Sequence, residues 1–313
     1  MDPIGALLAH AAAPAPRLEP TDEDAFADPA WGQALTALRR TPALRDPALT
    51  QLAAALPGLS DAYQAARVAL VCGTVVEWGG DPGRCGPAIV DRLAAEVGAG
   101  DGPRWARTVR FLCLAAMATM CRDVAVRRHA RTHAGFAGAL EATEIREASF
   151  VQTVVELVDD LELVVLHLER GEGVRLRLEA VANNFHLLTL LHGTVPAWCA
   201  DDPLDPEVWA QARGEAPPAA VTDHARFHVA LGAAMPAEGA PGIGASLWGE
   251  ALPDSIPSVG GERVLVASPM LLGGRSWDSG FFPNVHDALH PALTVLDRFD
   301  PAEVARRIAA LRG

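Results

Sequence analysis

The sequence contains no lysine, and all 26 of its basic residues are arginine. Several reaction classes need the lysine amine. A Walker A phosphate loop uses it to contact phosphates, Schiff-base and pyridoxal enzymes use it as a nucleophile, and Ser-x-x-Lys hydrolases use it as a base. The composition therefore excludes these three classes of chemistry.

Cysteine and long apolar runs are also scarce. The five cysteines show no Cys-x-x-Cys spacing, which favours small core residues in a reducing compartment. The longest strongly apolar uncharged run, residues 111–121, is much shorter than the roughly 20 residues that span a bilayer. The acidic residue Asp2 follows Met1 directly, and the N-terminal segment lacks the positive region of a secretory signal. We therefore expect a cytoplasmic protein that does not insert into a membrane.

Positive charge is in deficit. The chain has 39 acidic and 26 basic residues, which gives a net charge of −13. A surface of this sign repels nucleic-acid phosphates and anionic lipid headgroups. We therefore expect neither nucleic acid nor membrane as a partner.

The hydrophobic pattern divides the chain into a tail and two larger parts. Residues 1–30 combine several prolines with a cluster of acids, which predicts a weakly ordered acidic tail. From residue 31 to 160, apolar residues recur at helical spacing between Gly/Pro breaks, which predicts a helical domain. Within it, Asp101 and Pro103 predict the start of a long helix and Gly135 its end.

Residues 161–313 are predicted to form an α+β domain. Apolar residues alternate on both sides of a turn at 171–173, which is typical of a β-hairpin. Further patterns predict strands at 227–231, 245–248, 264–267 and 293–296, and helices that begin at Asn183 or Asn184, at Pro206 and at Asp300. The predicted fold class is α+β: a helical N-terminal half followed by a mixed, largely antiparallel sheet with flanking helices.

Three His-x-x-x-His pairs are candidates for metal binding: 129/133, 224/228 and 286/290. On a helix this spacing places two imidazoles about 6 Å apart on one face, whereas on a strand they are roughly 13 Å apart and cannot chelate. The first pair has the best helical context, but three neighbouring arginines would repel a cation. The second pair runs into a strand pattern.

In the third pair, Asp287 beside His286 offers an oxygen ligand, so His286, Asp287 and His290 form a candidate metal site. Pro291 biases the backbone of His290 away from a helix. The alternative is that these are ordinary surface or core histidines.

A polar and aromatic segment, residues 273–287, is the candidate binding loop. It gathers Arg275, Trp277, Asp278 and Asn284 beside two phenylalanines. An apolar floor with a few converging polar groups is how binding pockets are commonly lined. The alternative is that the aromatic residues fill the core while the polar residues cap the ends of elements.

The sequence contains no complete catalytic set. The segment 244–249 nearly matches Gly-x-Ser-x-Gly but has one extra residue before its last glycine. We therefore expect a non-catalytic interaction or regulatory protein that acts through a protein partner, needs no cofactor and could form a homo-oligomer. The alternative is a metal-assisted hydrolase in which His286, Asp287 and either His290 or the 224/228 pair hold a divalent metal such as zinc, which activates water.

Overall fold

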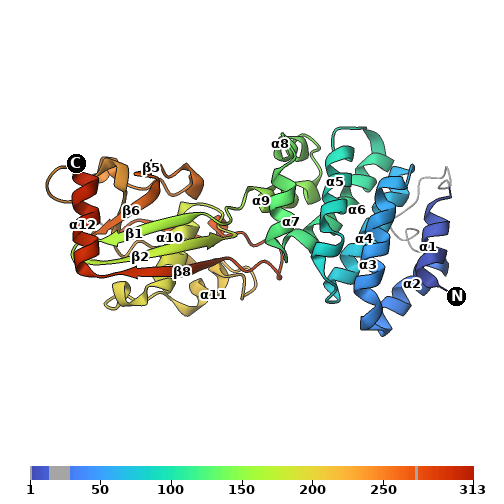
Figure 1. Ribbon diagram of the computed structural model, residues 1–313, viewed down its shortest axis with the longest axis horizontal. Coiled ribbons are helices and arrows are strands. Elements are labelled where there is room, and N and C mark those ends of the chain that lie inside the picture. Colours follow the sequence, from blue (N-terminus) through green and yellow to red (C-terminus); the bar gives the residue numbers. More distant parts are fainter. Residues whose placement is uncertain (1, 14–28, 272–273) are drawn as a thin grey trace. The chain divides into compact units, whose positions relative to one another are not determined.

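The chain divides into two units, Met1–Glu156 and Leu157–Gly313. The structure is a computed structural model that describes residues 2–13, 29–271 and 274–313 (Figure 1). The N-terminal unit is helical, and the C-terminal unit contains a mixed sheet with flanking helices, which confirms the predicted α+β class. The C-terminal unit begins at Leu157, a few residues before the predicted boundary at residues 160/161.

The described residues of the N-terminal unit form nine α-helices. They are α1 (Pro3–Ala11), α2 (Pro29–Arg40), α3 (Arg45–Ala55), α4 (Ala62–Glu77), α5 (Gly86–Glu96), α6 (Gly102–Met120), α7 (Val124–Arg131), α8 (Phe136–Glu141) and α9 (Arg146–Glu156). The longest two, α4 and α6, bury most of their apolar residues and form the centre of this unit. No helix in the described ranges has both the length and the apolar content that a bilayer crossing needs.

Part of the predicted weakly ordered tail is helical. The Asp2 side chain accepts a hydrogen bond from the Ile4 backbone N–H, and Pro3 occupies the first turn, so α1 has a regular N-terminal cap. Ile4, Leu7 and Ala11 of this helix are buried, and this burial offsets the entropy of ordering the segment. Residues 14–28 of the predicted tail lie outside the described residues.

The predicted long helix from Asp101 to Gly135 is divided into two. It begins as expected after Asp101, but α6 ends at Met120. The Asp123 side chain then accepts a 2.7 Å hydrogen bond from the Ala125 N–H and starts α7 as a separate helix. Gly135, with φ of 74°, caps the start of α8 instead of ending a long helix.

Gly73 sets the distance between α4 and α6. A Cβ atom added there would lie 2.8 Å from the Cα atom of Ala115, and a backbone atom cannot rotate away as a side chain can. We expect Gly73→Ala to lower the free energy of unfolding by about 1–3 kcal/mol, as overpacked cores do, despite better helix propensity. Urea denaturation measures this change. Gly138→Ala in α8, where the added Cβ meets nothing within 4 Å, is the control and is expected to be neutral or stabilising; equal behaviour of the two variants would contradict the close approach.

The C-terminal unit is built on one six-stranded sheet and a two-stranded ribbon. The strands are β1 (Glu162–His167), β2 (Glu172–Glu179), β3 (Thr222–His224), β4 (His228–Leu231), β5 (Ser258–Val259), β6 (Glu262–Ser268), β7 (Ser276–Asp278) and β8 (Ala292–Phe299). The main sheet has the order β4-β6-β1-β2-β8 with β5 paired to β6, and only β1 and β6 run parallel. The predicted hairpin is confirmed as β1–β2.

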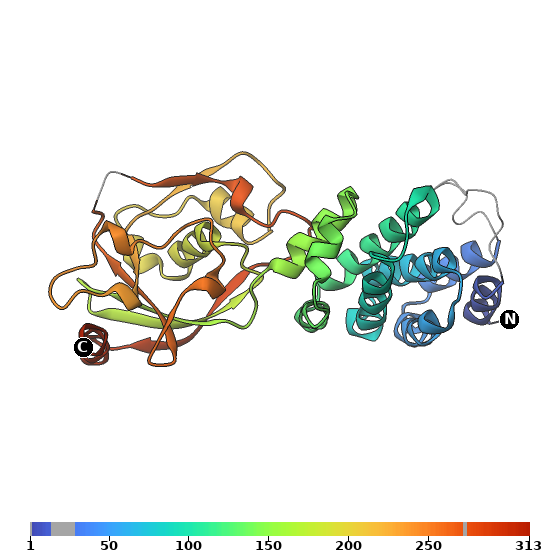
Figure 2. The ribbon, with the colours of Figure 1, turned by 90° about the horizontal axis from the view of Figure 1, so that it is seen from above.

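Helices cover the two faces of the main sheet (Figures 1 and 2). They are α10 (Asn184–Thr194), α11 (Pro206–Ala212) and α12 (Pro301–Arg312). Leu163 and Val165 of β1 point into the larger core with α10, whereas Val164 and Leu166 pack against α12. Side chains alternate across a strand, so β1 is buried on both faces.

One predicted strand is absent. Residues 245–248 form no extended ladder; Ile243–Ala245 is a short 3₁₀ turn, and Ser246 makes only an isolated bridge to Ala230. In this segment Ile243 and Trp248 are exposed, whereas Ala245 and Leu247 are buried.

Candidate functional site

The described residues of the C-terminal unit enclose a cavity of about 490 Å³. This volume lies within the range of roughly 300–1,000 Å³ typical of ligand pockets. We call it the Arg275 pocket; its walls include Leu188, Phe227, His228, Ser246, Leu247 and Arg275. The walls come from α10, β4, the turn at 243–248 and the residues before β7, so several elements of the C-terminal unit shape it.

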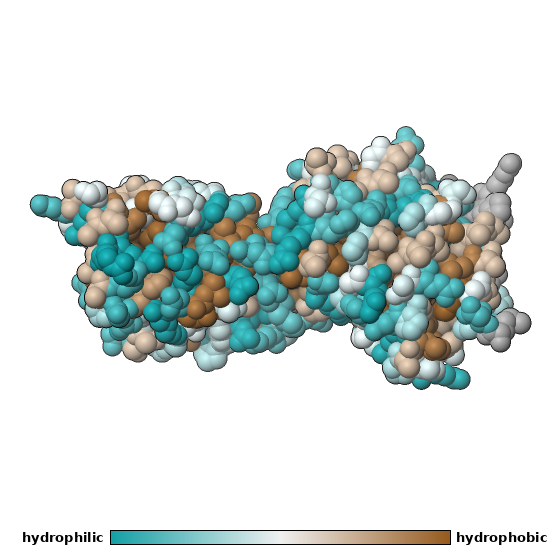
Figure 3. Space-filling model, in the orientation of Figure 1, coloured by the Kyte–Doolittle hydropathy of each residue, from teal (hydrophilic) through white to brown (hydrophobic). Residues whose placement is uncertain are grey.

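Large apolar residues surround the opening of the Arg275 pocket. Trp248 is 66% exposed, and Ile243, Met270 and Leu271 are also exposed. We call these four residues the apolar rim. Figure 3 shows hydrophilic and apolar residues mixed over the visible face of each unit, so isolated exposed apolar residues are ordinary here. Four around one cavity are not isolated, and such patches mark sites of interaction.

Arg275 places a positive charge in the wall of the pocket. Its Nη1 donates a 2.8 Å hydrogen bond to the Leu247 carbonyl, and its guanidinium lies 4.7 Å from the centre of the Phe185 ring. In the described part of the chain, no carboxylate lies within 4.0 Å of it. Burial lowers the pKa of Arg275 and the negative charge of Glu250 opposes this, but an arginine stays protonated in proteins. Its remaining N–H donors can bind an anion.

His228 adds a second polar group. It lies on β4, and its Nε2 atom is buried without a hydrogen-bond partner in the described chain. Burial lowers its pKa and the charge of Arg275 lowers it further, while a backbone hydrogen bond to Gly242 opposes them. The lowered pKa favours the neutral imidazole near pH 7.

The candidate binding loop divides between the pocket and the core. Arg275 lines the pocket, but Trp277 is 3% exposed, and its Nε1 donates to Thr189 Oγ1 at 2.9 Å. Asp278 accepts a hydrogen bond from the Gly280 N–H, and Asn284 lies 3.5 Å from the Ser279 carbonyl. Thus the four residues do not converge on one site, and only Arg275 lies at the cavity.

A buried polar cluster lies beside Trp277. The Asp223 carboxylate accepts hydrogen bonds of 2.7 Å from Thr189 Oγ1 and from Arg226 Nη1. His192 Nδ1 accepts from the same Arg226 nitrogen at 2.9 Å and lies 3.4 Å from Asp223 Oδ2. Burial lowers the pKa of His192, so the cluster contains one carboxylate, one guanidinium and a neutral imidazole. Its groups satisfy one another, which indicates a structural role.

The candidate metal ligands of the C-terminal unit do not come together. His286 Nδ1 accepts from the Ala288 N–H in a tight turn. His286, Asp287 and His290 do not form a ligand group among the described residues, where such a group requires atoms within 4.8 Å of one another. His224 lies on β3 and bonds Asp202 at 2.6 Å, whereas His228 lies on β4 in the main sheet, so the two histidines do not share one strand.

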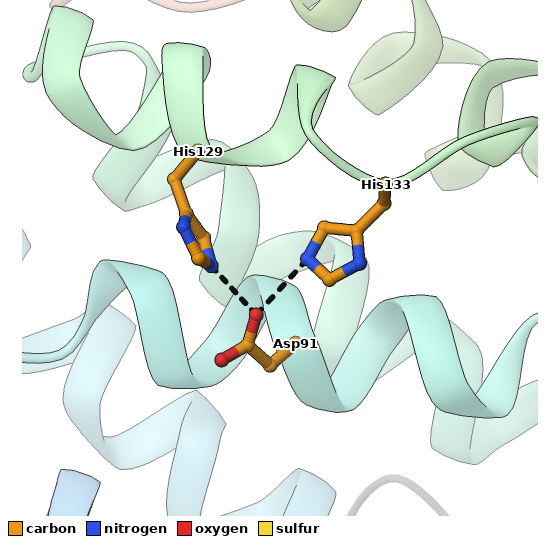
Figure 4. Close-up of side chains that lie close together, drawn as sticks. All are labelled: Asp91, His129 and His133. Atoms are coloured by element: carbon orange, nitrogen blue, oxygen red, sulfur yellow. Dashed lines mark hydrogen bonds and ion pairs between the residues drawn. The ribbon is translucent and has the colours of Figure 1, made fainter.

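A different group meets the spacing for a metal. His129 of α7 and His133 just after it both direct Nε2 at Oδ1 of Asp91 on α5, at 2.6 and 3.0 Å (Figure 4). The His-x-x-x-His spacing marks the two histidines in the sequence but not Asp91. No local signal marks Asp91, because it meets the histidines only through the packing of α5 against α7.

A scan against protein-family models and searches of curated proteins and of solved structures found no match to this chain. Its function is therefore argued from the geometry of its own residues.

Proposed function

We propose that this chain is a non-catalytic interaction protein whose C-terminal unit binds a segment of a partner protein. The segment places apolar side chains in the Arg275 pocket and a carboxylate against Arg275. The observation that supports this is a half-buried guanidinium that makes no close ion pair in the described chain, with only the more distant charge of Glu250 acting on it, at a cavity ringed by four exposed apolar residues.

The apolar rim supplies the binding energy in this proposal. Burial of apolar surface contributes roughly 25 cal/mol per Å², and Trp and Arg are the residue types most enriched among those that dominate interface energies. Trp248 and Arg275 provide one of each at the same opening. Trp248 is 66% exposed, and a protein segment can cover this surface as well as fill the cavity, which favours a segment over a small molecule.

Arg275 supplies the specificity. A charged hydrogen bond to a carboxylate is stronger at low dielectric than in water, and the guanidinium is already partly removed from solvent. A segment that brings an apolar side chain but no carboxylate leaves this charge unpaired as the opening is covered. An acidic or C-terminal carboxylate is therefore the matching group.

The proposed site of action is the cytoplasm. All five cysteines are buried and free of disulfides, which supports a reducing compartment. The homo-oligomer considered from the sequence would correspond to a second copy of this chain on the same rim.

The proposal predicts position-specific cross-linking. A photoreactive aromatic amino acid in place of Trp248, which keeps a large apolar ring at this position, is expected to capture a discrete partner protein in the native cell. Adding Arg275→Ala is expected to reduce the yield at least about tenfold, since interface arginines commonly contribute 2 kcal/mol or more. Gel shift and mass spectrometry of the adducts give the measurement.

Leu252 provides the matched control. It is also exposed and lies in the same unit, but it does not line the pocket. The same photoreactive group at position 252 is expected to capture no such partner. Identical adducts from both positions, or a yield unchanged by Arg275→Ala, would contradict the proposal; capture of a second copy of this chain would replace the partner by a homo-oligomer.

A further inference from the structure

The three side chains shown in Figure 4 lie in the N-terminal unit, remote in sequence from the Arg275 pocket. We propose that Asp91, His129 and His133 form a binding site for one divalent transition-metal ion of the zinc class. The ligand set is two imidazole nitrogens and one carboxylate oxygen.

The geometry already gathers the three donor atoms. Both Nε2 atoms contact the same oxygen, and all three ligand atoms lie within 4.8 Å of one another. Zinc binds such ligands at about 2.0–2.2 Å, which corresponds to ligand atoms about 3.4 Å apart in a tetrahedral site. The hydrogen-bond distances of 2.6 and 3.0 Å therefore need to lengthen by less than about 1 Å when the ion takes the place of the shared protons.

The two helices that carry the ligands are held close together. A Cβ atom added at Gly86 of α5 would lie 2.5 Å from a side-chain carbon of Val126 in α7, so the helices approach one another near the site. Asp123 caps the start of α7, and His133 follows its last turn. His129 lies in the last turn of α7 and His133 lies two residues beyond its end, and their ring centres are 5.4 Å apart.

The three candidate ligands are partly exposed to solvent. The side chains of His129 and His133 are 33% and 29% exposed, and that of Asp91 is 56% exposed. An ion can enter, and three protein ligands leave one tetrahedral position for water, as in zinc sites that keep an exchangeable ligand.

Two of the three neighbouring arginines, Arg127 and Arg131, bond to backbone carbonyls. Arg127 is buried, and its Nη1 donates to the Met120 carbonyl at 2.8 Å. Arg131 Nε donates to the Val155 carbonyl at 2.9 Å. These two guanidiniums are thus engaged by carbonyls on other segments, while the carboxylate of Asp91 faces both imidazoles directly.

The test is calorimetric titration of ZnCl₂ into the full chain after chelator treatment and dialysis. The expected result is one zinc per chain, with His129→Ala and His133→Ala each weakening binding at least about 100-fold, the upper end of what loss of an outer-shell partner costs. Asp91→Asn is expected to weaken it similarly, because the amide keeps the shape and removes the charge. Magnesium, which prefers six oxygen ligands, is expected to give no such binding.

The control is His224→Ala. His224 makes the same 2.6 Å contact with an exposed aspartate, Asp202, but no second histidine completes a ligand group among the described residues. Its loss is expected to leave zinc binding unchanged. No stoichiometric zinc binding, or equal losses in His129→Ala and His224→Ala, overturns the proposal, and circular dichroism of each variant separates lost ligands from lost fold.

Discussion

Replacement of Asp223 by alanine is expected to destabilise the C-terminal unit by about 3–5 kcal/mol, the usual effect of removing one partner of a buried ion pair. The side chains of Asp223 and Arg226 are 1% and 4% exposed. Without the carboxylate, the guanidinium keeps its charge in a buried position and the Thr189 hydroxyl loses its acceptor. Urea denaturation followed by tryptophan fluorescence measures the change.

Asp202→Ala is the matched control. Asp202 also pairs with a basic side chain, His224 at 2.6 Å, but both groups are about half exposed. Exposed ion pairs contribute about 0–1 kcal/mol, so this variant is expected to remain close to the wild type. Equal losses in the two variants would contradict the buried-pair account.

The Asp223 contribution also depends on pH. Burial raises the pKa of Asp223, but its contacts with His192 and Arg226 lower it by more, so that the pKa lies well below its usual range. A folded-state pKa below the unfolded value of about 3.9 means that the folded protein holds the carboxylate more strongly ionised. The stabilisation is therefore complete above about pH 5 and declines as the pH falls below about 4, and the difference between wild type and Asp223→Ala is expected to narrow in that range.

Much of the fold follows from local sequence signals. The alternation of apolar and polar residues that ends at His167 and resumes at Val174 corresponds to the β1–β2 hairpin. The side chains of Asn183 and Asp300 cap α10 and α12. Each of these signals acts within a few residues, through strand periodicity or a single capping hydrogen bond. Such signals can be interpreted without knowing the rest of the fold.

The departures from prediction are tertiary in origin. Residues 245–248 have a strand-like composition, but they meet β4 at a single bridge, and strand formation needs a partner along its whole length. The division between α6 and α7 depends on one capping aspartate, Asp123, inside a segment whose apolar pattern continues. Asp91 illustrates the same limit for a site, because it joins His129 only when α5 packs against α7.

The candidate binding loop shows why side-chain direction decides function. In β7 the register places Trp277 opposite Asp223, and alternation along the strand points Trp277 inward while Ser276 and Asp278 point outward. The two residues are close in sequence, but Arg275 lines the pocket and Trp277 is buried in the core.

Trp277→Ala is therefore expected to lower the free energy of unfolding by about 3–5 kcal/mol, as other large buried aromatic side chains do. Its ring stacks on Phe185 at 5.1 Å, and its Nε1 bonds Thr189. Trp277→Phe keeps most of the ring volume and is expected to lose far less. Urea denaturation of both variants gives the comparison.

Arg275→Ala and Trp248→Ala test the Arg275 pocket separately from the core, because they remove its charged group and its largest exposed apolar group. Trp248 is mostly exposed, so its removal is expected to change stability by no more than about 0.5 kcal/mol; loss of the Arg275 contacts is expected to cost about 1 kcal/mol. Both are expected to impair partner capture in a folded protein.

If Trp277→Ala left stability intact, Trp277 would not be a core residue. The double variant Trp277→Ala/Asp223→Ala is expected to lose less free energy of unfolding than the sum of the two single variants, because both side chains bond to the hydroxyl of Thr189.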